Sequence, residues 1–171
     1  MAIKIGGIEA LFRHPVKSMG GEALEQAELG RPGSPVELTH LDRGIFDAAS
    51  ISAITSATVG ESAQLAGHSP DVRRFRPNIL ISSEQSDPFV EDAWVGGVLW
   101  FGEGDTAAAI AVTNWDQRCS MVNYDPDSGL TTPEVLKAVV RERENKAGIY
   151  GTVIRCGRLA VGQSLYFTPT A

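Results

Sequence analysis

Short apolar runs rich in valine, isoleucine and threonine recur along this chain, and glycines are frequent between them. Runs of this length and composition are typical of β-strands rather than helices. Pro15 follows the first run and prevents it from continuing as a central strand. The strands predicted in this way are Ile3–Phe12, Val36–Leu41, Asn78–Ser82, Val98–Phe101, Ala108–Thr113, Gly151–Arg155 and Leu159–Phe167, the last one broken near Gly162.

Residues Thr55–Ala66 carry the signals of a helix instead. Gly67 suits its C-terminal end, because glycine readily adopts the left-handed conformation that often closes a helix. Thr58 and Glu61 fit a capping box, although Thr55 or the serine after it could equally begin the helix. The sequence therefore does not decide which of Thr55, Ser56 and Thr58 begins the helix.

A second helix is predicted from about Pro133 to Glu144. Thr132 suits its N-cap and Pro133 its first helical position, where the missing N–H has no helical partner to lose. The apolar face of this helix is predicted to consist of Val135, Leu136, Val139 and Val140.

Many strands with only a few helices predict a mainly β fold. Strands and helices do not alternate regularly, which favours a barrel or a sandwich over a doubly wound sheet. At 171 residues the chain is most simply one domain, and a hydrophobic fraction of 43% is ample for a core.

The formal net charge of −6 argues against a general nucleic-acid binder, which needs a basic face to offset the repulsion of phosphates. No apolar run approaches the length of a membrane span, and the N-terminus lacks the zones of a signal peptide. We therefore expect neither a nucleic-acid nor a membrane partner, and a cytoplasmic location where thiols stay reduced. The cysteines and histidines do not have the spacing of a zinc site.

Cys119 is the strongest candidate for chemistry because Arg118 precedes it directly. A thiolate attacks, carries sulfur or binds a soft metal, and an adjacent cation favours the thiolate over the thiol. Asp116 would oppose that effect by balancing the arginine. Cysteine is often buried merely as a small apolar residue, but the polar neighbours of Cys119 argue against a core strand. Cys156 lies at a predicted hairpin tip, and we expect no role for it.

A basic cluster, from Arg73 to Asn78, is a candidate for binding an anion. If this segment is extended, the side chains of Arg74, Arg76 and Asn78 project from one face of the strand. Planar guanidinium groups on that face could grip a phosphate with paired hydrogen bonds. A solvated edge strand with ordinary salt bridges to nearby acids explains the pattern equally well.

Two further segments offer weaker anion sites. Lys17 and Ser18 precede glycines whose backbone N–H groups can face a phosphate, although a plain turn explains them better. Thr55 and Ser56 offer hydroxyls and unpaired N–H groups at a helix start, and N-capping explains these residues at least as well.

Taken in order, these motifs resemble the MOSC family, the C-terminal domain of molybdenum cofactor sulfurases. The resemblance extends to stand-alone bacterial MOSC proteins and to the amidoxime-reducing component family. The order and spacing of the motifs over nearly the whole chain make the resemblance specific. The matching segments are His14–Ser18, Ile54–Ala57, Arg74–Asn78, Pro88–Gly96, Arg118–Cys119, Asp125–Gly129, Val135–Leu136, Gly148–Gly151 and Gly157–Gly162.

The resemblance implies a MOSC-type β-barrel with an anionic pterin, the molybdenum cofactor (molybdopterin), bound in a cleft. It implies that Cys119 binds molybdenum or carries a persulfide, and thiolate ligation suits a metal that dithiolene sulfurs already hold. The residues that match pterin- and phosphate-binding positions are Lys17, Ser18, Thr55, Ser56, Arg76 and Asn78, to which we add Arg74 and Arg118 as candidates.

Two features depart from the family pattern. The stretch between Ser18 and Arg74 is much shorter than in two-domain relatives, which indicates a single domain whose residues 1–45 form a truncated β extension. Asp116 stands near the expected place of an anionic cofactor. That position is unfavourable unless its side chain points away or bonds a pterin nitrogen.

The leading hypothesis is a molybdenum-dependent oxidoreductase that reduces N-hydroxylated or related small molecules. Cys119 would be the metal ligand, and a separate electron-transfer protein would supply electrons. The alternative is a sulfur-carrier domain, in which a sulfur donor loads a persulfide onto Cys119. The third hypothesis is a non-catalytic pterin- or phosphate-binding module with an inert Cys119.

Overall fold

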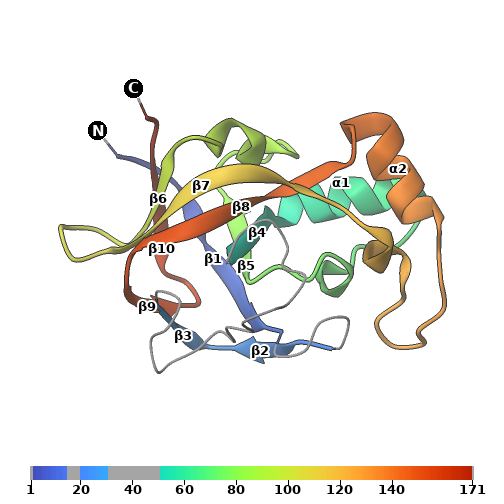
Figure 1. Ribbon diagram of the computed structural model, residues 1–171, viewed down its shortest axis with the longest axis horizontal. Coiled ribbons are helices and arrows are strands. Elements are labelled where there is room, and N and C mark those ends of the chain that lie inside the picture. The colour runs from blue at the N-terminus through green and yellow to red at the C-terminus, as the bar shows by residue number, and fades with distance from the viewer. Residues whose placement is uncertain (1, 15–19, 31–50, 171) are drawn as a thin grey trace, which may run out of the picture.

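The computed structural model describes residues 2–14, 20–30 and 51–170 of the chain. Seven strands in these ranges enclose a barrel. They are β1 (Ile3–Arg13), β4 (Ile51–Thr55), β5 (Ile79–Ser83), β6 (Val98–Phe101), β7 (Ala108–Gln117), β8 (Lys146–Arg155) and β10 (Ser164–Thr168). Their order around the barrel is β10, β6, β7, β8, β4, β5, β1, and the antiparallel pairing of β1 with β10 closes it (Figure 1).

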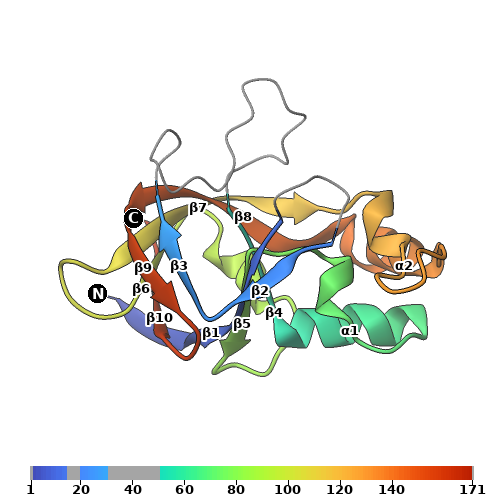
Figure 2. The same ribbon diagram turned by 90° about the horizontal axis from the view of Figure 1, so that it is seen from below.

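The remaining elements attach to this barrel. They are β2 (Glu22–Leu24), β3 (Gln26–Leu29), β9 (Gly157–Ala160), α1 (Ser56–Ala66), α2 (Glu134–Arg143) and the 3-10 helices η1 (Val72–Arg74), η2 (Val90–Trp94) and η3 (Ser120–Asn123). β2 extends the sheet beside β1, and β3 pairs with β9 in a small second sheet. The two α-helices lie together at one end of the barrel, as both views show (Figure 2). Within the described ranges, no helix is long and apolar enough to cross a membrane.

The closed barrel confirms the predicted mainly β fold. Neighbouring barrel strands are antiparallel except β4 and β5, which are parallel and joined through α1, since a parallel pair needs a crossover connection. In their register Ala53 lies opposite Ile79. The pairing therefore places Thr55, at the end of β4, away from Asn78, which precedes β5.

Apolar side chains fill two cores, one on each side of the barrel wall. Ala53 belongs to the interior core, whereas the next residue, Ile54, belongs to an outer core. This alternation follows from the period of two along a strand. The outer core joins β4 and β5 to η1, η3 and the helices; its buried members are Ile54, Val59, Phe75, Leu80, Val122, Val135, Val139 and Ala147.

The first helix confirms the prediction for its ends. Thr55 is the N-cap of α1, and its side chain accepts a hydrogen bond from the N–H of Thr58. This settles the open start in favour of Thr55 over the capping box at Thr58. Gly67 closes the helix with a left-handed backbone, at φ 71°.

The second helix differs from the prediction in two details. Its N-cap is Pro133 rather than Thr132. Its buried stripe is Val135, Ala138 and Val139, whereas Val140 is 49% exposed. Val140 lies five positions after Val135, or about 140° around the helix, and so leaves the face that packs on α1.

The strand predictions hold for most of the barrel, with four exceptions. β2, β3, β4 and the first half of β8 were not predicted, and β5 begins at Ile79 rather than Asn78. β4 is only five residues long and is buried at every position, so it shows no alternating pattern. The predicted strand Val36–Leu41 lies outside the described residues.

A buried carboxyl group supports the start of α1. Glu91, in η2, is fully buried; its Oε1 accepts from the N–H of Thr55 at 3.3 Å and its Oε2 from the Thr55 hydroxyl at 3.0 Å. The Thr58 hydroxyl accepts from the N–H of Phe89 at 2.7 Å, which further fixes η2 to the first turn of α1. Burial raises the pKa of Glu91 above its ordinary value of 4.5, against the opposing effect of these hydrogen bonds.

Glu91→Gln should remove a pH dependence from the stability of the fold. Because the pKa is raised in the folded state, the folded protein keeps a proton that the unfolded chain loses above pH 4.5. The free energy of unfolding of the wild type should therefore fall relative to the variant as pH rises through 4.5, and level off above the raised pKa. Urea unfolding of both proteins from roughly pH 4 to pH 8 measures this difference. A difference that does not change with pH would contradict the raised pKa.

Gly148 in β8 is a second point on which the fold depends. Its φ is +91°, and a Cβ there would lie 2.8 Å from the Ala53 carbonyl oxygen and 3.0 Å from Nη2 of Arg118. Gly148→Ala should therefore cost roughly 2–4 kcal/mol of unfolding free energy, from backbone strain and overpacking together. Gly60→Ala is the matched control, because nothing lies within 4 Å of a Cβ there. This control should stabilise α1 by roughly 0.5–1 kcal/mol. Equal effects of the two substitutions in urea unfolding would contradict the packing described for β8.

Candidate functional site

Cys119 lies at the turn where β7 ends and η3 begins. Its backbone is extended, with φ −109° and ψ 179°, and its carbonyl oxygen accepts from the N–H of Val122 at 3.3 Å. The residue is exposed and its thiol is not in a disulfide. The turn therefore presents a thiol at the surface, where a ligand or a partner can reach it.

Arg118 turns the other way, into the protein, and is only 8% exposed. Its Nε donates to the carbonyl oxygen of Ala147 at 2.7 Å, and its Nη1 donates to that of Phe75 at 2.7 Å. Its Nη2 forms an ion pair with Asp116, which is itself 2% exposed. The guanidinium carbon also lies 5.4 Å from the centre of the Phe75 ring. Such partners compensate the loss of water around a buried cation.

This arrangement differs from the predicted effect of Arg118 on the thiol. Its charge is balanced by Asp116 and its donors serve two carbonyl groups, so the guanidinium is not directed at solvent. The Asp116 carboxylate is buried as well, which removes the expected conflict with an anion at the surface. Arg118 instead links the end of β7 to the start of β8 and to the segment before β5.

The basic cluster does not have the extended backbone on which the shared strand face of Arg74, Arg76 and Asn78 depended. Asp71 caps η1 by accepting from the N–H of Arg73 at 2.9 Å, and this local bond turns the chain instead of extending it. Arg76 then adopts a left-handed backbone, at φ 50°, directly before a proline. The side chains of Arg74, Arg76 and Asn78 therefore do not share one strand face.

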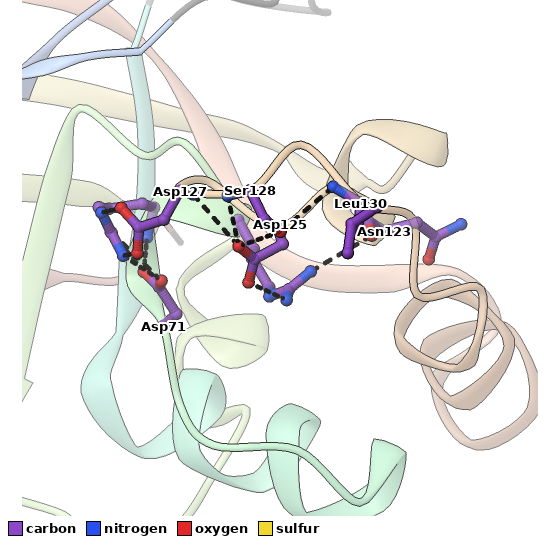
Figure 3. Close-up of polar contacts among 8 residues, drawn as sticks. Asp71, Asn123, Asp125, Asp127, Ser128 and Leu130 are labelled. Carbon is purple, nitrogen blue, oxygen red and sulfur yellow. Dashed lines mark hydrogen bonds and ion pairs between the residues drawn. The ribbon is translucent and has the colours of Figure 1, made fainter.

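Arg74 binds the Asp125 carboxylate and the Asn123 carbonyl oxygen, and Figure 3 labels both of these residues. Its Nη2 donates to Asp125 Oδ2 at 2.9 Å, its Nη1 donates to the carbonyl oxygen of Asn123 at 3.3 Å, and its side chain is 10% exposed. Arg73 likewise binds Asp127. These two arginines make the ion pairs of the alternative interpretation, although not on an edge strand.

Asn78 and His14 tie the end of β1 to the start of β5. Asn78 Oδ1 accepts from the N–H of Ser52 at 3.0 Å, and its Nδ2 donates to the carbonyl oxygen of Phe12 at 3.5 Å. His14 Nε2 lies 3.1 Å from the carbonyl oxygen of Pro77 and must carry the hydrogen, since a carbonyl only accepts. Burial lowers the pKa of His14, which favours its neutral form.

The predicted hydroxyl groups at the start of α1 bind other groups of the protein. Thr55 is fully buried, and its hydroxyl serves Thr58 and Glu91. Ser56 Oγ donates to the carbonyl oxygen of Ile81 at 3.5 Å. Both residues therefore act in capping and anchoring α1. Lys17 and Ser18 lie outside the described residues.

Three of the predicted site residues come to neighbouring turns. The bond from Arg118 to the Phe75 carbonyl oxygen holds the turn of Cys119 beside the turn of Arg76, and Asn78 follows two residues later. Thr55, Ser56, Arg74 and Arg118 instead make the internal contacts described above. The carbonyl groups that hold Arg118 were not predicted, because a backbone carbonyl has no sequence signature. The one signal in the sequence for an internally paired Arg118 was Asp116, two positions before it.

A family model and several solved structures place the chain among known proteins. The family model, described as the MOSC domain, matches residues 40–166. A comparison with curated proteins yields no match.

Solved structures with the same fold include stand-alone bacterial proteins. The YuaD protein from Bacillus subtilis matches with a TM-score of 0.75 at 19% identity, with 100% of both chains covered. YiiM from Geobacillus stearothermophilus matches with a TM-score of 0.61 at 16% identity, covering 97% of this chain and 73% of that one. YiiM from Escherichia coli matches with a TM-score of 0.59 at 15% identity, covering 100% of this chain and 71% of that one. At such identities the likeness concerns the fold, and the family follows from the sequence model: the chain belongs to the MOSC domain family.

Proposed function

We propose that this protein binds the molybdenum cofactor, with Cys119 as the protein ligand of the metal, and reduces N-hydroxylated or related small molecules. MOSC domains are associated with this cofactor, and the chain is one of them. The observation that carries the proposal is the exposed thiol of Cys119, on a turn that Arg118 fixes beside Arg76.

The donor set suits an anionic cofactor with a soft metal. A thiolate is the protein ligand that a sulfur-bound metal favours. Arg76 supplies a cation on the neighbouring turn, and Lys17 and Ser18 would add a cation and a hydroxyl for the phosphate. Because Asp116 is buried and paired, its charge is balanced before any anion binds.

The other candidate residues would not contact the cofactor but would hold the backbone around the site in place. Arg118 and Arg74 fix the turns on which Cys119 and Arg76 stand. Asn78 joins β1 to β4 and so would hold the strands that lie beside the turn of Arg76. Thr55 and Ser56 would contribute by anchoring α1, as described above.

When bound, the cofactor supplies oxidation–reduction chemistry at its metal. Reduction of an N-hydroxyl group takes up an electron pair and a pair of protons, and it yields an amine and water. The electrons would come from a separate electron-transfer protein in the cytoplasm. The chain itself would bind the anionic group, hold Cys119 in place and orient the substrate.

The exposure of Cys119 also favours a second function, that of a sulfur carrier. An exposed thiol can receive sulfane sulfur from a donor as a persulfide and pass it to a metal–sulfur cofactor. This role needs an accessible sulfur and a docking partner but no retained metal. The two functions therefore differ in what remains bound to the purified protein.

Cys119→Ser should abolish molybdenum binding, because it replaces a soft thiolate by a hard hydroxyl. Protein purified from a host that makes the cofactor should contain near-stoichiometric molybdenum in the wild type and almost none in the variant, by elemental analysis. Cys156→Ser is the matched control, since Cys156 is also exposed and free, and its metal content should equal that of the wild type.

Molybdenum retained at the wild-type level in Cys119→Ser would contradict the ligand assignment. Metal in neither protein, with cyanide-labile sulfur released from the wild type alone, would favour the sulfur carrier. If the wild type contains neither molybdenum nor labile sulfur, the remaining hypothesis is a non-catalytic pterin- or phosphate-binding module.

Arg76→Gln should weaken cofactor retention more than it weakens the fold. The substitution keeps the polar side chain at φ 50° but removes the cation beside the proposed anion. We expect about tenfold faster loss of cofactor on dialysis, for one lost charge-assisted contact. Arg141→Gln is the control, because Arg141 pairs with Glu142 on the exposed surface of α2. Equal retention in both variants would contradict a role for Arg76.

A further inference from the structure

Arg76, which carries the cation proposed for the anionic ligand, has a strained backbone. Its φ of 50° lies in the left-handed region that favours glycine, and a residue before a proline prefers an extended backbone. Among the described residues, the other non-glycine residues with a positive φ are Phe89, Glu144 and Asn145. A strained conformation persists only where the surrounding structure holds it. The contacts on each side of Arg76 therefore show what holds its backbone.

The carbonyl group before Arg76 is held by Arg118. The carbonyl oxygen of Phe75 accepts a hydrogen bond from Nη1 of Arg118 at 2.7 Å. Phe75 is only 3% exposed, and loss of a hydrogen bond costs more at a buried group than at the surface. This contact fixes the peptide group that joins Phe75 to Arg76.

The carbonyl group after Arg76 is held by His14. The carbonyl oxygen of Pro77, which is also buried, accepts from Nε2 of His14 at 3.1 Å. One residue further, the carbonyl oxygen of Asn78 accepts from the N–H of Phe12 at 2.9 Å. The end of β1 thus lies along the segment that follows Arg76. Side chains from two distant parts of the chain therefore hold the backbone on both sides of this residue.

The ring of His14 fits against Gly21, which directly precedes β2. A Cβ on Gly21 would lie 2.4 Å from both Nδ1 and Cε1 of the ring. On β1 the ring also stacks on Phe12, with the ring centres 6.4 Å apart. The absence of a side chain at Gly21 therefore leaves room for the ring in the orientation that brings Nε2 to Pro77.

His14 acts at this place as a neutral donor. Burial is the main cause that lowers its pKa, and the nearby charge of Arg76 lowers the pKa further. Nδ1 is buried and has no hydrogen-bond partner among the described residues, so a second proton there would have no acceptor. The neutral ring with its hydrogen on Nε2 is the form that fits both Pro77 and the neighbouring cation.

We propose that His14 is a positioning residue which, together with Arg118, holds Arg76 in its left-handed backbone and so fixes the Arg76 cation beside the turn of Cys119. His14 acts through the Pro77 carbonyl group and not through contact with a ligand. A cation that is already fixed loses less freedom when an anion binds, so this arrangement favours retention of an anionic ligand. The effect on retention rests on the proposed function, whereas the effect on the backbone concerns the protein without cofactor.

Urea unfolding of variants at Arg76 measures the strain. Arg76→Gly should unfold at a higher urea concentration than Arg76→Ala, by roughly 0.5 M, because glycine adopts this backbone without strain. In a His14→Phe background, which keeps a ring but removes the donor, this difference should fall by half or more, because the backbone can relax. Glu144 is the matched control, with a φ of 51° at the end of α2. The difference between Glu144→Gly and Glu144→Ala should be the same in both backgrounds.

Two further pairs of variants separate the hydrogen bond from the packing of the ring. His14→Gln can place an amide nitrogen near the position of Nε2, and it should keep most of the difference between glycine and alanine at Arg76. Gly21→Ala should act as His14→Phe does, because its Cβ displaces the ring. Gly20→Ala is its control, since nothing lies within 4 Å of a Cβ there. If His14→Phe does not fold, the comparison of Gly21→Ala with Gly20→Ala decides.

Cofactor retention measures the consequence for the site. His14→Phe and Gly21→Ala should lose bound molybdenum on dialysis about fivefold faster than the wild type, whereas His14→Gln should lose it at nearly the wild-type rate. Addition of His14→Phe to Arg76→Gln should cause no further loss, since both changes act on the same cation.

Three results would overturn the proposal: an unchanged difference between Arg76→Gly and Arg76→Ala in the His14→Phe and Gly21→Ala backgrounds, a His14→Gln variant that behaves as His14→Phe does, or additive effects on retention. A wild type without molybdenum would instead contradict the proposed function. The urea comparison would then still decide the role of His14, because it needs no cofactor.

Discussion

The buried guanidinium of Arg118 is the interaction on which the arrangement of the candidate site depends. It joins the end of β7 to Ala147 in β8 and to Phe75 before β5, and Asp116 balances its charge. Loss of one partner of such a buried group leaves polar atoms without compensation, at roughly 3–5 kcal/mol. The fold therefore keeps this contact, and with it the closeness of the turns that carry Cys119 and Arg76.

Although the chain has a net charge of −6, several of its arginines form ion pairs within the protein. Arg118 is buried and pairs with Asp116. Arg73 and Arg74 bind carboxylates of the loop between η3 and α2. These cations fix the backbone around the thiol, whereas Arg76 and Lys17 are the positive groups proposed for an anionic ligand.

The sequence allowed a mainly β fold, most of its strands and both helices to be predicted, because strand composition and capping act locally. The choice of a barrel over a sandwich came from the resemblance to a family. The order of short motifs also led to the MOSC family, which the sequence model confirms. The side chains of Arg74, Arg76 and Asn78 do not share the strand face considered for them. The hydrogen bond that Asp71 accepts from Arg73 turns the chain there and competes with an extended backbone. The inward direction of Arg118 and the burial of Glu91 depend on segments distant in sequence, which no local pattern encodes. The roles of Cys119 and of the cofactor-binding residues stay predictions.

Anomalous diffraction at the molybdenum edge, from crystals of the cofactor-loaded protein, would show whether Cys119 is the protein ligand of molybdenum. We expect one anomalous peak within bonding distance of Cys119 Sγ, on the side of the turn that faces Arg76. A peak away from Cys119, or a bound cofactor whose metal contacts no protein sulfur, would contradict it.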